Sequence, residues 1–116
     1  MAYQSIANAE DVNVDHQIVR NATVAIAIST TDTDAIASAG SNTGTFQIPA
    51  AFTGATMQPK FSNDGTNYTA VGSTISVSAN GTYVIPADCF RARYFKLTSA
   101  SSEAAARTIR LFLTRT

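Results

Sequence analysis

The sequence predicts an all-β fold, a single-domain antiparallel β-sandwich of jelly-roll type, and three observations support this prediction. Twenty Ala, sixteen Thr and eleven Ser against three Leu favour β structure over a helical bundle. Asn63-Asp64-Gly65 lies between two runs of alternating apolar and polar residues, which indicates a hairpin. A phrase that reads Gly-Thr-aromatic-x-Ile-Pro-Ala occurs at 44–50 and again at 81–87, which suits strands that cross between two sheets.

The charges are segregated along the chain although they sum to zero. Residues 1–59 hold five acidic residues and one basic residue, whereas residues 60–116 hold three acidic and seven basic residues. An ordinary solvated surface is one interpretation of this asymmetry. Association between an acidic arm and the basic body of a neighbouring subunit is the other.

Residues 1–16 show no sustained period, so we expect an extended N-terminal arm ahead of a β-sandwich domain at 17–116. Tyr3 and Ile6 near its tip could simply fray, or could fasten the arm onto a neighbouring subunit. No basic segment followed by an apolar one opens the chain, so no secretory signal is expected. No apolar run reaches the length of a membrane span, and we expect no membrane contact.

The residues from 17 to 29 predict a strand with Val24, Ile26 and Ile28 on its inward face. Residues 31–34, which read Thr-Asp-Thr-Asp, predict a turn, and a short strand follows around Ile36. In each repeated phrase we expect Gly to start a strand, the aromatic residue and Ile to face the core, and Pro to end the ladder. An Ala-rich turn then carries the chain to another strand. Chance similarity of short β phrases is the alternative explanation.

The central hairpin is expected to turn at Asn63, Asp64 and Gly65. Its incoming strand places Met57, Pro59 and Phe61 on one face, and its outgoing strand continues a face with Tyr68 and Ala70. The turn could also offer oxygens to calcium, but a calcium site needs six or more, so no metal is expected.

The second half predicts three further strands and a second hairpin turn at Asn80-Gly81. The strand at 74–78 points Ile75 and Val77 inward, and the strand at 91–98 does so with Phe95 and Leu97. Residues 99–106 form a loop or one helical turn, because three consecutive Ala are too few for a stable helix.

The last strand, at 108–114, exposes Arg110 and Phe112 and buries the residues that alternate with them, namely Ile109, Leu111 and Leu113. Arg110 and Phe112 make a candidate protein-contact surface, although Phe112 could equally pack under a neighbouring loop.

No residue set predicts catalysis, a metal or a cofactor. His16, beside Asp15 in the arm, is the single His of the sequence. A catalytic triad would need a Ser at a fixed position beside it, and the sequence indicates none. Cys89 is alone, which excludes an internal disulfide, and it is expected to be a small buried hydrophobe. Arg91, Arg93 and Lys96 resemble a basic nucleic-acid face, but an alternating strand near a turn produces the same spacing. The balanced charge gives no long-range attraction to nucleic acid, so we expect no nucleic-acid binding. Because no catalytic residue set is recognised, we also expect no enzyme activity.

Two segments carry a family resemblance. The hairpin at 61–68 followed by Ala92-Arg93-Tyr94-Phe95-Lys96-Leu97 resembles the discoidin-like, galactose-binding type of jelly roll. The compact style rich in Ala, Thr and Ser also resembles small virion proteins of tailed bacteriophages, which decorate or cement capsids or form the bases of spikes. Tyr68 stands where the discoidin hairpin usually has Trp.

The resemblance implies a structural protein on the capsid surface, whose partners are the major capsid protein or other virion proteins. It also implies a homo-oligomer, with a trimer favoured, in which Tyr3, Ile6, Arg110 and Phe112 lie at contacts. A carbohydrate-binding adhesion module that uses Tyr68 and Tyr83 is the alternative.

Overall fold

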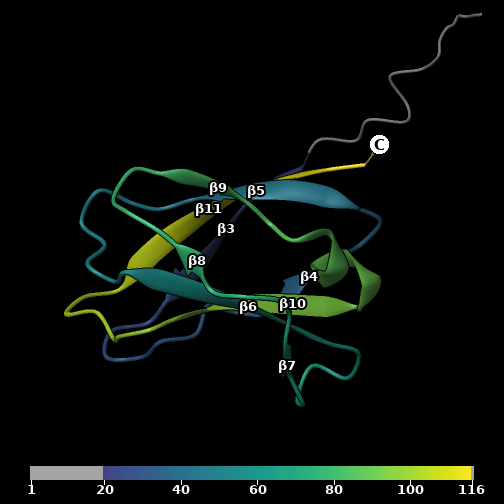
Figure 1. Cartoon of the computed structure of the whole chain (residues 1–116), viewed down its shortest axis with the longest axis horizontal. Coiled ribbons are helices and arrows are strands. Elements are labelled where there is room, and N and C mark those ends of the chain that lie inside the picture. The colour runs from purple at the N-terminus through teal and green to yellow at the C-terminus, as the bar shows by residue number, and fades with distance from the viewer. Residues whose placement is uncertain (1–19, 116) are drawn as a thin grey trace, which may run out of the picture.

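The computed structural model describes residues 20–115, so the predicted arm lies outside the described residues. Within them, two antiparallel sheets pack against each other (Figure 1). A short 3₁₀ helix, η2 (Ala87–Arg91), is the one helix of the described range. The strands are β3 (Arg20–Ile26), β4 (Ile36–Ala37), β5 (Thr43–Gln47), β6 (Thr56–Ser62), β7 (Thr69–Ala70), β8 (Ile75–Ser76), β9 (Thr82–Val84), β10 (Tyr94–Ser99) and β11 (Arg107–Thr114).

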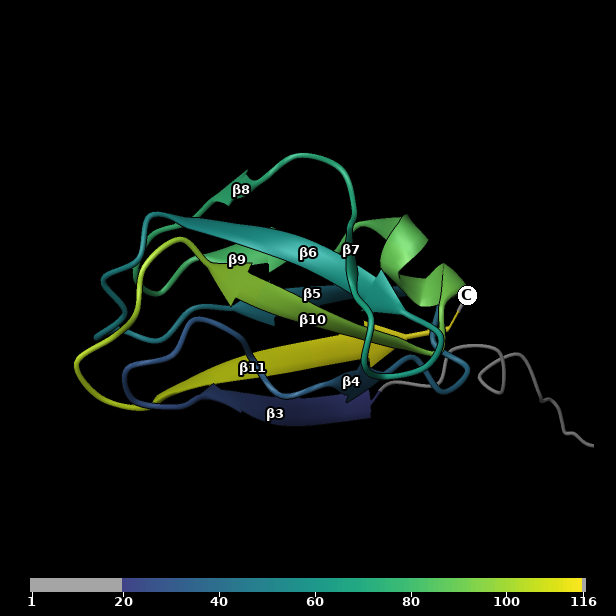
Figure 2. The ribbon, with the colours of Figure 1, turned by 90° about the horizontal axis from the view of Figure 1, so that it is seen from below.

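The strand order is that of a jelly roll, which confirms the predicted fold class. The four-stranded sheet has the order β3-β11-β5-β9, and the five-stranded sheet has the order β4-β10-β6-β7 with β8 also paired to β6. Apart from the run β6–β7–β8, each strand lies in the sheet opposite to the strand before it. This alternation between two sheets defines the double Greek key. Figure 2 looks onto the five-stranded sheet, whose strands β6 and β10 lie in front of β9 and β5 of the other sheet.

The two repeated phrases become neighbouring strands. Phe46 of β5 lies opposite Tyr83 of β9, and their ring centroids are 5.7 Å apart. After Pro49 and Pro86 the chain crosses to the five-stranded sheet, from β5 to β6 and from β9 to β10. The predicted crossing after each Pro is confirmed.

The pairing of the phrases is locally two-fold. The N–H of Ile48 donates to the carbonyl of Gly81, and the N–H of Ile85 donates to the carbonyl of Gly44, each over 2.9 Å. Each Gly is needed for close approach. A Cβ at Gly44 would lie 2.8 Å from the Leu113 side chain, and one at Gly81 would lie 2.7 Å from the ring of Tyr83.

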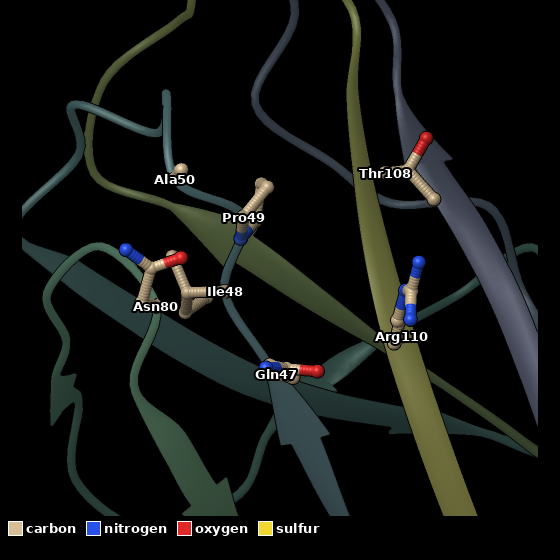
Figure 3. Close-up of a pocket in the computed structure, with 7 residues that line it drawn as sticks. All are labelled: Gln47, Ile48, Pro49, Ala50, Asn80, Thr108 and Arg110. Carbon is tan, nitrogen blue, oxygen red and sulfur yellow. The ribbon is translucent and has the colours of Figure 1, made fainter.

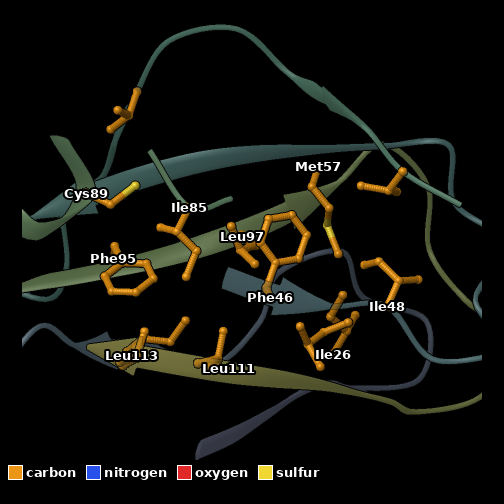
Figure 4. Close-up of a cluster of buried hydrophobic side chains, with 14 of the residues drawn as sticks. Ile26, Phe46, Ile48, Met57, Ile85, Cys89, Phe95, Leu97, Leu111 and Leu113 are labelled. Atoms are coloured by element: carbon orange, nitrogen blue, oxygen red, sulfur yellow. The ribbon is translucent and has the colours of Figure 1, made fainter. Parts of the chain in front are cut away.

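One core fills the space between the sheets (Figure 4). Phe95 and Leu97 point into it from the five-stranded sheet, as predicted. The four-stranded sheet contributes Phe46 and the three predicted residues of β11, Ile109, Leu111 and Leu113, all fully buried. Cys89 is also buried, and burial raises the pKa of its thiol to about 11.

Two expectations for the first half are wrong. Ile28 does not face inward, because β3 ends at Ile26 and Ser29 adopts a positive φ of 63°; the Ile28 side chain is 58% exposed. Residues 31–34 are not a turn, because Asp32 bridges to Thr98 and Thr33 bridges to Ile26. This segment therefore links the two sheets along one side of the sandwich.

The central hairpin forms between β6 and β7, and its incoming strand has the predicted phasing. Phe61 lies opposite Phe95 and packs half-buried against the core, on the same face as Met57 and Pro59. Ser62, on the other face, is also buried, because its hydroxyl accepts the N–H groups of Asp64 and Gly65. The outgoing strand turns Val71 toward the core. Val71 is buried, whereas Ala70 is exposed and Tyr68 is half-buried.

Asn80-Gly81 is a turn but not a hairpin. Asn80 has a positive φ of 65°, and the N–H of Gly81 donates to the carbonyl of Ser78 over 3.1 Å. The flanking strands β8 and β9 lie in different sheets, so the turn carries the chain between sheets.

Candidate functional site

The outer side of the four-stranded sheet forms an open surface, which we call the threonine face. It consists of the side chains that point away from the core on β3, β5, β9 and β11. Most of these side chains are exposed, Thr23, Arg110 and Val84 among them. Its six threonines are Thr23, Thr43, Thr45, Thr82, Thr108 and Thr114.

An apolar row crosses the threonine face. The ladder registers place Phe112 of β11 beside Thr45 of β5, and Thr45 beside Val84 of β9. Phe112 is 36% exposed and Val84 is 72% exposed. Because adjacent strands lie about 4.8 Å apart, these two side chains stand about 10 Å apart across Thr45.

Arg110 lies at the centre of the threonine face. Its ladder neighbours are Thr23 and Gln47, and its side chain borders two shallow hollows, one on the β5 side and one on the β3 side. Figure 3 shows Arg110 and Gln47 projecting from adjacent strands at the first hollow. Arg110 forms no ion pair with any acidic residue of 20–115.

The composition of the threonine face suits protein contact. Its outward ladder positions include no Lys, Asp or Glu, and protein interfaces are depleted in these residues. Thr loses less rotamer freedom on burial than the long charged side chains do. An interface on this face would therefore cost little side-chain entropy to order.

The outer side of the five-stranded sheet differs because Lys96 has an acidic partner there. The Nζ of Lys96 lies 2.8 Å from Oδ2 of Asp32 and 4.3 Å from the centre of the Tyr68 ring. Thr98 donates its hydroxyl to Oδ1 of Asp32 over 2.7 Å. Partial burial alone would raise the pKa of Asp32, but the bonds from Lys96 and Thr98 outweigh it and lower that pKa.

The residues considered for nucleic-acid binding do not form an open basic face. Arg91 belongs to η2 and pairs with Asp88 over 3.0 Å. Arg93 lies 5.8 Å from the centre of the Tyr94 ring, and Lys96 is held by Asp32.

The predicted turn residues Asn63, Asp64 and Gly65 organise the hairpin loop. Oδ1 of Asp64 accepts the N–H groups of Asn67 and Thr66, each over 2.8 Å. These bonds hold the pKa of Asp64 well below its ordinary value. Oδ1 of Asn63 accepts the N–H of Arg93 over 3.2 Å and so ties the loop to the entrance of β10.

The two tyrosines considered for sugar stacking have partners inside the molecule. Tyr83 packs against Phe46, and its hydroxyl accepts the N–H of Ser78 over 2.8 Å. The ring of Tyr68 carries the ammonium group of Lys96 over one face.

The described residues contain no candidate metal-binding cluster. No group of three or more His, Cys, Asp or Glu residues within 20–115 could hold a metal ion. No helix in this range is long and apolar enough to cross a membrane. His16, Tyr3 and Ile6 lie outside the described residues.

Sequence reasoning missed the role of Glu103. Its buried carboxylate accepts the N–H and the hydroxyl of Thr53, each over 2.9 Å, and the Nε–H of Arg107 over 3.0 Å. Burial opposes ionisation, but these bonds outweigh it and lower the pKa of Glu103. The Glu103 carbonyl also accepts the N–H of Ser29, so Glu103 joins three loops at one end of the sandwich.

Comparison of the chain with protein-family models, with curated proteins and with solved structures finds no match.

Proposed function

We propose that this protein is a structural virion protein of a tailed bacteriophage, which decorates or cements the capsid through protein–protein contacts. The observation that carries the proposal is the threonine face, with its exposed row of Phe112 and Val84 and its central Arg110. The jelly roll is also a frequent fold of capsid proteins. The resemblance of the sequence to small virion proteins gives the location on the capsid surface.

The proposed partners are copies of the same chain and the major capsid protein or another virion protein. Contact through a sheet face suits both, since a flat face with small side chains can be ordered at low entropic cost. Among homo-oligomers, a trimer is the form that the resemblance favours.

A binding assay with capsids tests the proposal. The purified full-length chain is co-sedimented with empty capsids of the phage that encodes it, and its own mass is measured by light scattering. The double variant Phe112→Ser, Val84→Ser should lose binding or self-association, because it removes the apolar row from the threonine face.

Ile28→Ser is the matched control. Ile28 is equally apolar and exposed, but it lies in the turn after β3 and outside the threonine face. The control should bind as the unchanged protein does. A full-length chain that stays monomeric and ignores capsids would remove the proposal.

A further inference from the structure

We infer that the threonine face binds the acidic N-terminal segment, residues 1–19, of a second copy of the chain. The inference rests on the self-association included in the proposed function, and it names what covers the threonine face. Each subunit would then give its own segment to one neighbour and receive a segment from another or from the same neighbour.

Charge complementarity is the first reason. Residues 1–19 hold three acidic residues, Glu10, Asp11 and Asp15, and no Lys or Arg. Residues 20–116 hold eight basic and five acidic residues. Arg110 is the charged residue on the ladder positions of the threonine face, and no acid in the described part pairs with it. A carboxylate from the segment would supply that missing partner.

Apolar complementarity is the second reason. The same segment carries Tyr3, Ile6, Val12 and Val14 among its polar residues. The row of Phe112 and Val84 offers these side chains an apolar surface close to Arg110. Residues 1–19 therefore contain both kinds of group that the face would select.

The position at which the described chain begins is the third reason. Arg20 pairs with Leu113 and Asn21 pairs with Phe112, so residues 1–19 join the sheet at the edge of the threonine face. Nineteen residues can extend over about 60 Å, which is ample to reach a neighbouring subunit.

A second copy is favoured over the chain's own face. Residues 16–19, which lead directly into Arg20, contain none of the residues that favour turns, namely Gly, Pro, Asn, Asp and Ser. β3 is the edge strand beside β11, so covering its own face would require a sharp reversal immediately before Arg20. Crossing to a neighbour requires no such reversal.

A charge-swap experiment with two full-length variants tests the inference. The first variant, Arg110→Glu, makes the face acidic while its segment stays acidic. The second variant, Glu10→Lys, Asp11→Lys, Asp15→Lys, makes the segment basic while its face stays basic. Each variant alone sets like charges against each other and should weaken self-association about tenfold or more in sedimentation velocity.

Mixing the two variants in equal amounts should restore association between unlike subunits, because each face then meets a segment of opposite charge. A ring of three subunits regains two of its three contacts. Arg93→Glu is the matched control, since it makes the same charge change on an exposed Arg outside the threonine face, and it should associate as the unchanged protein does. Restoration on mixing also demonstrates that both variants are folded. Higher salt should weaken the unchanged oligomer.

Several results would overturn the inference. A monomeric unchanged protein would do so, and so would an Arg110→Glu variant that associates normally. Variants that stay apart when mixed would also do so, and would leave the chain's own segment or a virion protein as the occupant. Capsid binding measured on the same samples separates the two proposals. If mixing fails while capsids still discriminate the Phe112→Ser, Val84→Ser variant, the inference fails and the proposed function stands.

Discussion

The outer sides of the two sheets arise from the same alternation of inward and outward side chains, but they differ in whether loops supply partners to the outward side chains. On the five-stranded sheet, Lys96 is paired with Asp32 and rests on the ring of Tyr68. On the four-stranded sheet, Arg110 has no such partner among the described residues, and Phe112 is exposed beside it. Strand sequence alone does not decide whether a face is complete.

Loops account for the difference. Asp32 comes from the segment after β3, and Tyr68 comes from the hairpin loop before β7; both reach over the five-stranded sheet. Within residues 20–115, no loop gives Arg110 an ion-pair partner. The comparison therefore supports the threonine face as the proposed binding surface.

The largest expected effect concerns the core beneath both faces. Phe95→Ala should lower the free energy of unfolding by about 3–5 kcal/mol, because it removes a fully buried ring between the sheets. Phe61→Ala should cost clearly less, since Phe61 is half-buried. Urea unfolding of both variants measures the difference. Equal losses would show that Phe61 contributes as much to the core as Phe95 does.

A smaller loss is expected at the end where the sheets are joined by loops. Glu103→Gln should cost about 1–3 kcal/mol, because it removes the buried negative charge that pairs with Arg107 and replaces charge-assisted hydrogen bonds with neutral ones. The folded-state pKa of Glu103 is lowered, so its contribution is present above the unfolded value near 4.5. It is lost as the pH falls through the folded pKa. Unfolding measured against pH should therefore show a shallower acid loss in Glu103→Gln; parallel curves would contradict this.

On the closed five-stranded face the effect should be smaller still. Asp32→Ala removes the partners of Lys96 and Thr98 but should lower stability by about 1 kcal/mol or less, since the pair is partly exposed. Thermal melting measures this. Association should not change, and a loss of oligomer would show that the five-stranded face also makes contacts.

The smallest effect on stability is expected on the threonine face itself. Phe112→Ser alone should change the free energy of unfolding by less than about 0.5 kcal/mol, because surface positions tolerate substitution. Leu111→Ala, one residue away and fully buried, should cost about 2–5 kcal/mol. Denaturant curves for the two variants measure this contrast. A destabilised Phe112→Ser variant would mean that Phe112 serves the fold rather than binding.

The features predicted correctly are those encoded by short stretches of sequence. The alternation of 108–114 gave both the buried and the exposed residues of β11, and the repeated phrases gave the crossings between sheets. The sequence could not tell that these phrases would pair with each other, because pairing depends on the whole topology.

The errors came from contacts between distant residues. The expectation for Ile28 failed because β3 ends at Ile26, where Thr33 forms a bridge, and the burial of Ser62 was missed because its hydroxyl anchors the loop. Glu103 is a single acid in a loop of Ala and Ser, and its partner Thr53 is fifty residues away, so no local signal marks it. The threonine face was partly visible, since Arg110 and Phe112 were placed outward. Val84 was not, because its row exists only across three strands.

The central position of β11 in its sheet has a consequence for synthesis on the ribosome. β11 lies between β3 and β5 in the sheet, but it is synthesised after both of them. Neither β3 nor β5 therefore has its main pairing partner until β11 has emerged. The nascent chain must therefore keep two unpaired strand edges in solution until elongation through Thr114. A stalled chain that lacks β11 would expose these edges to other nascent copies. Insertion of one strand thus completes the sheet and ends the period of greatest aggregation risk.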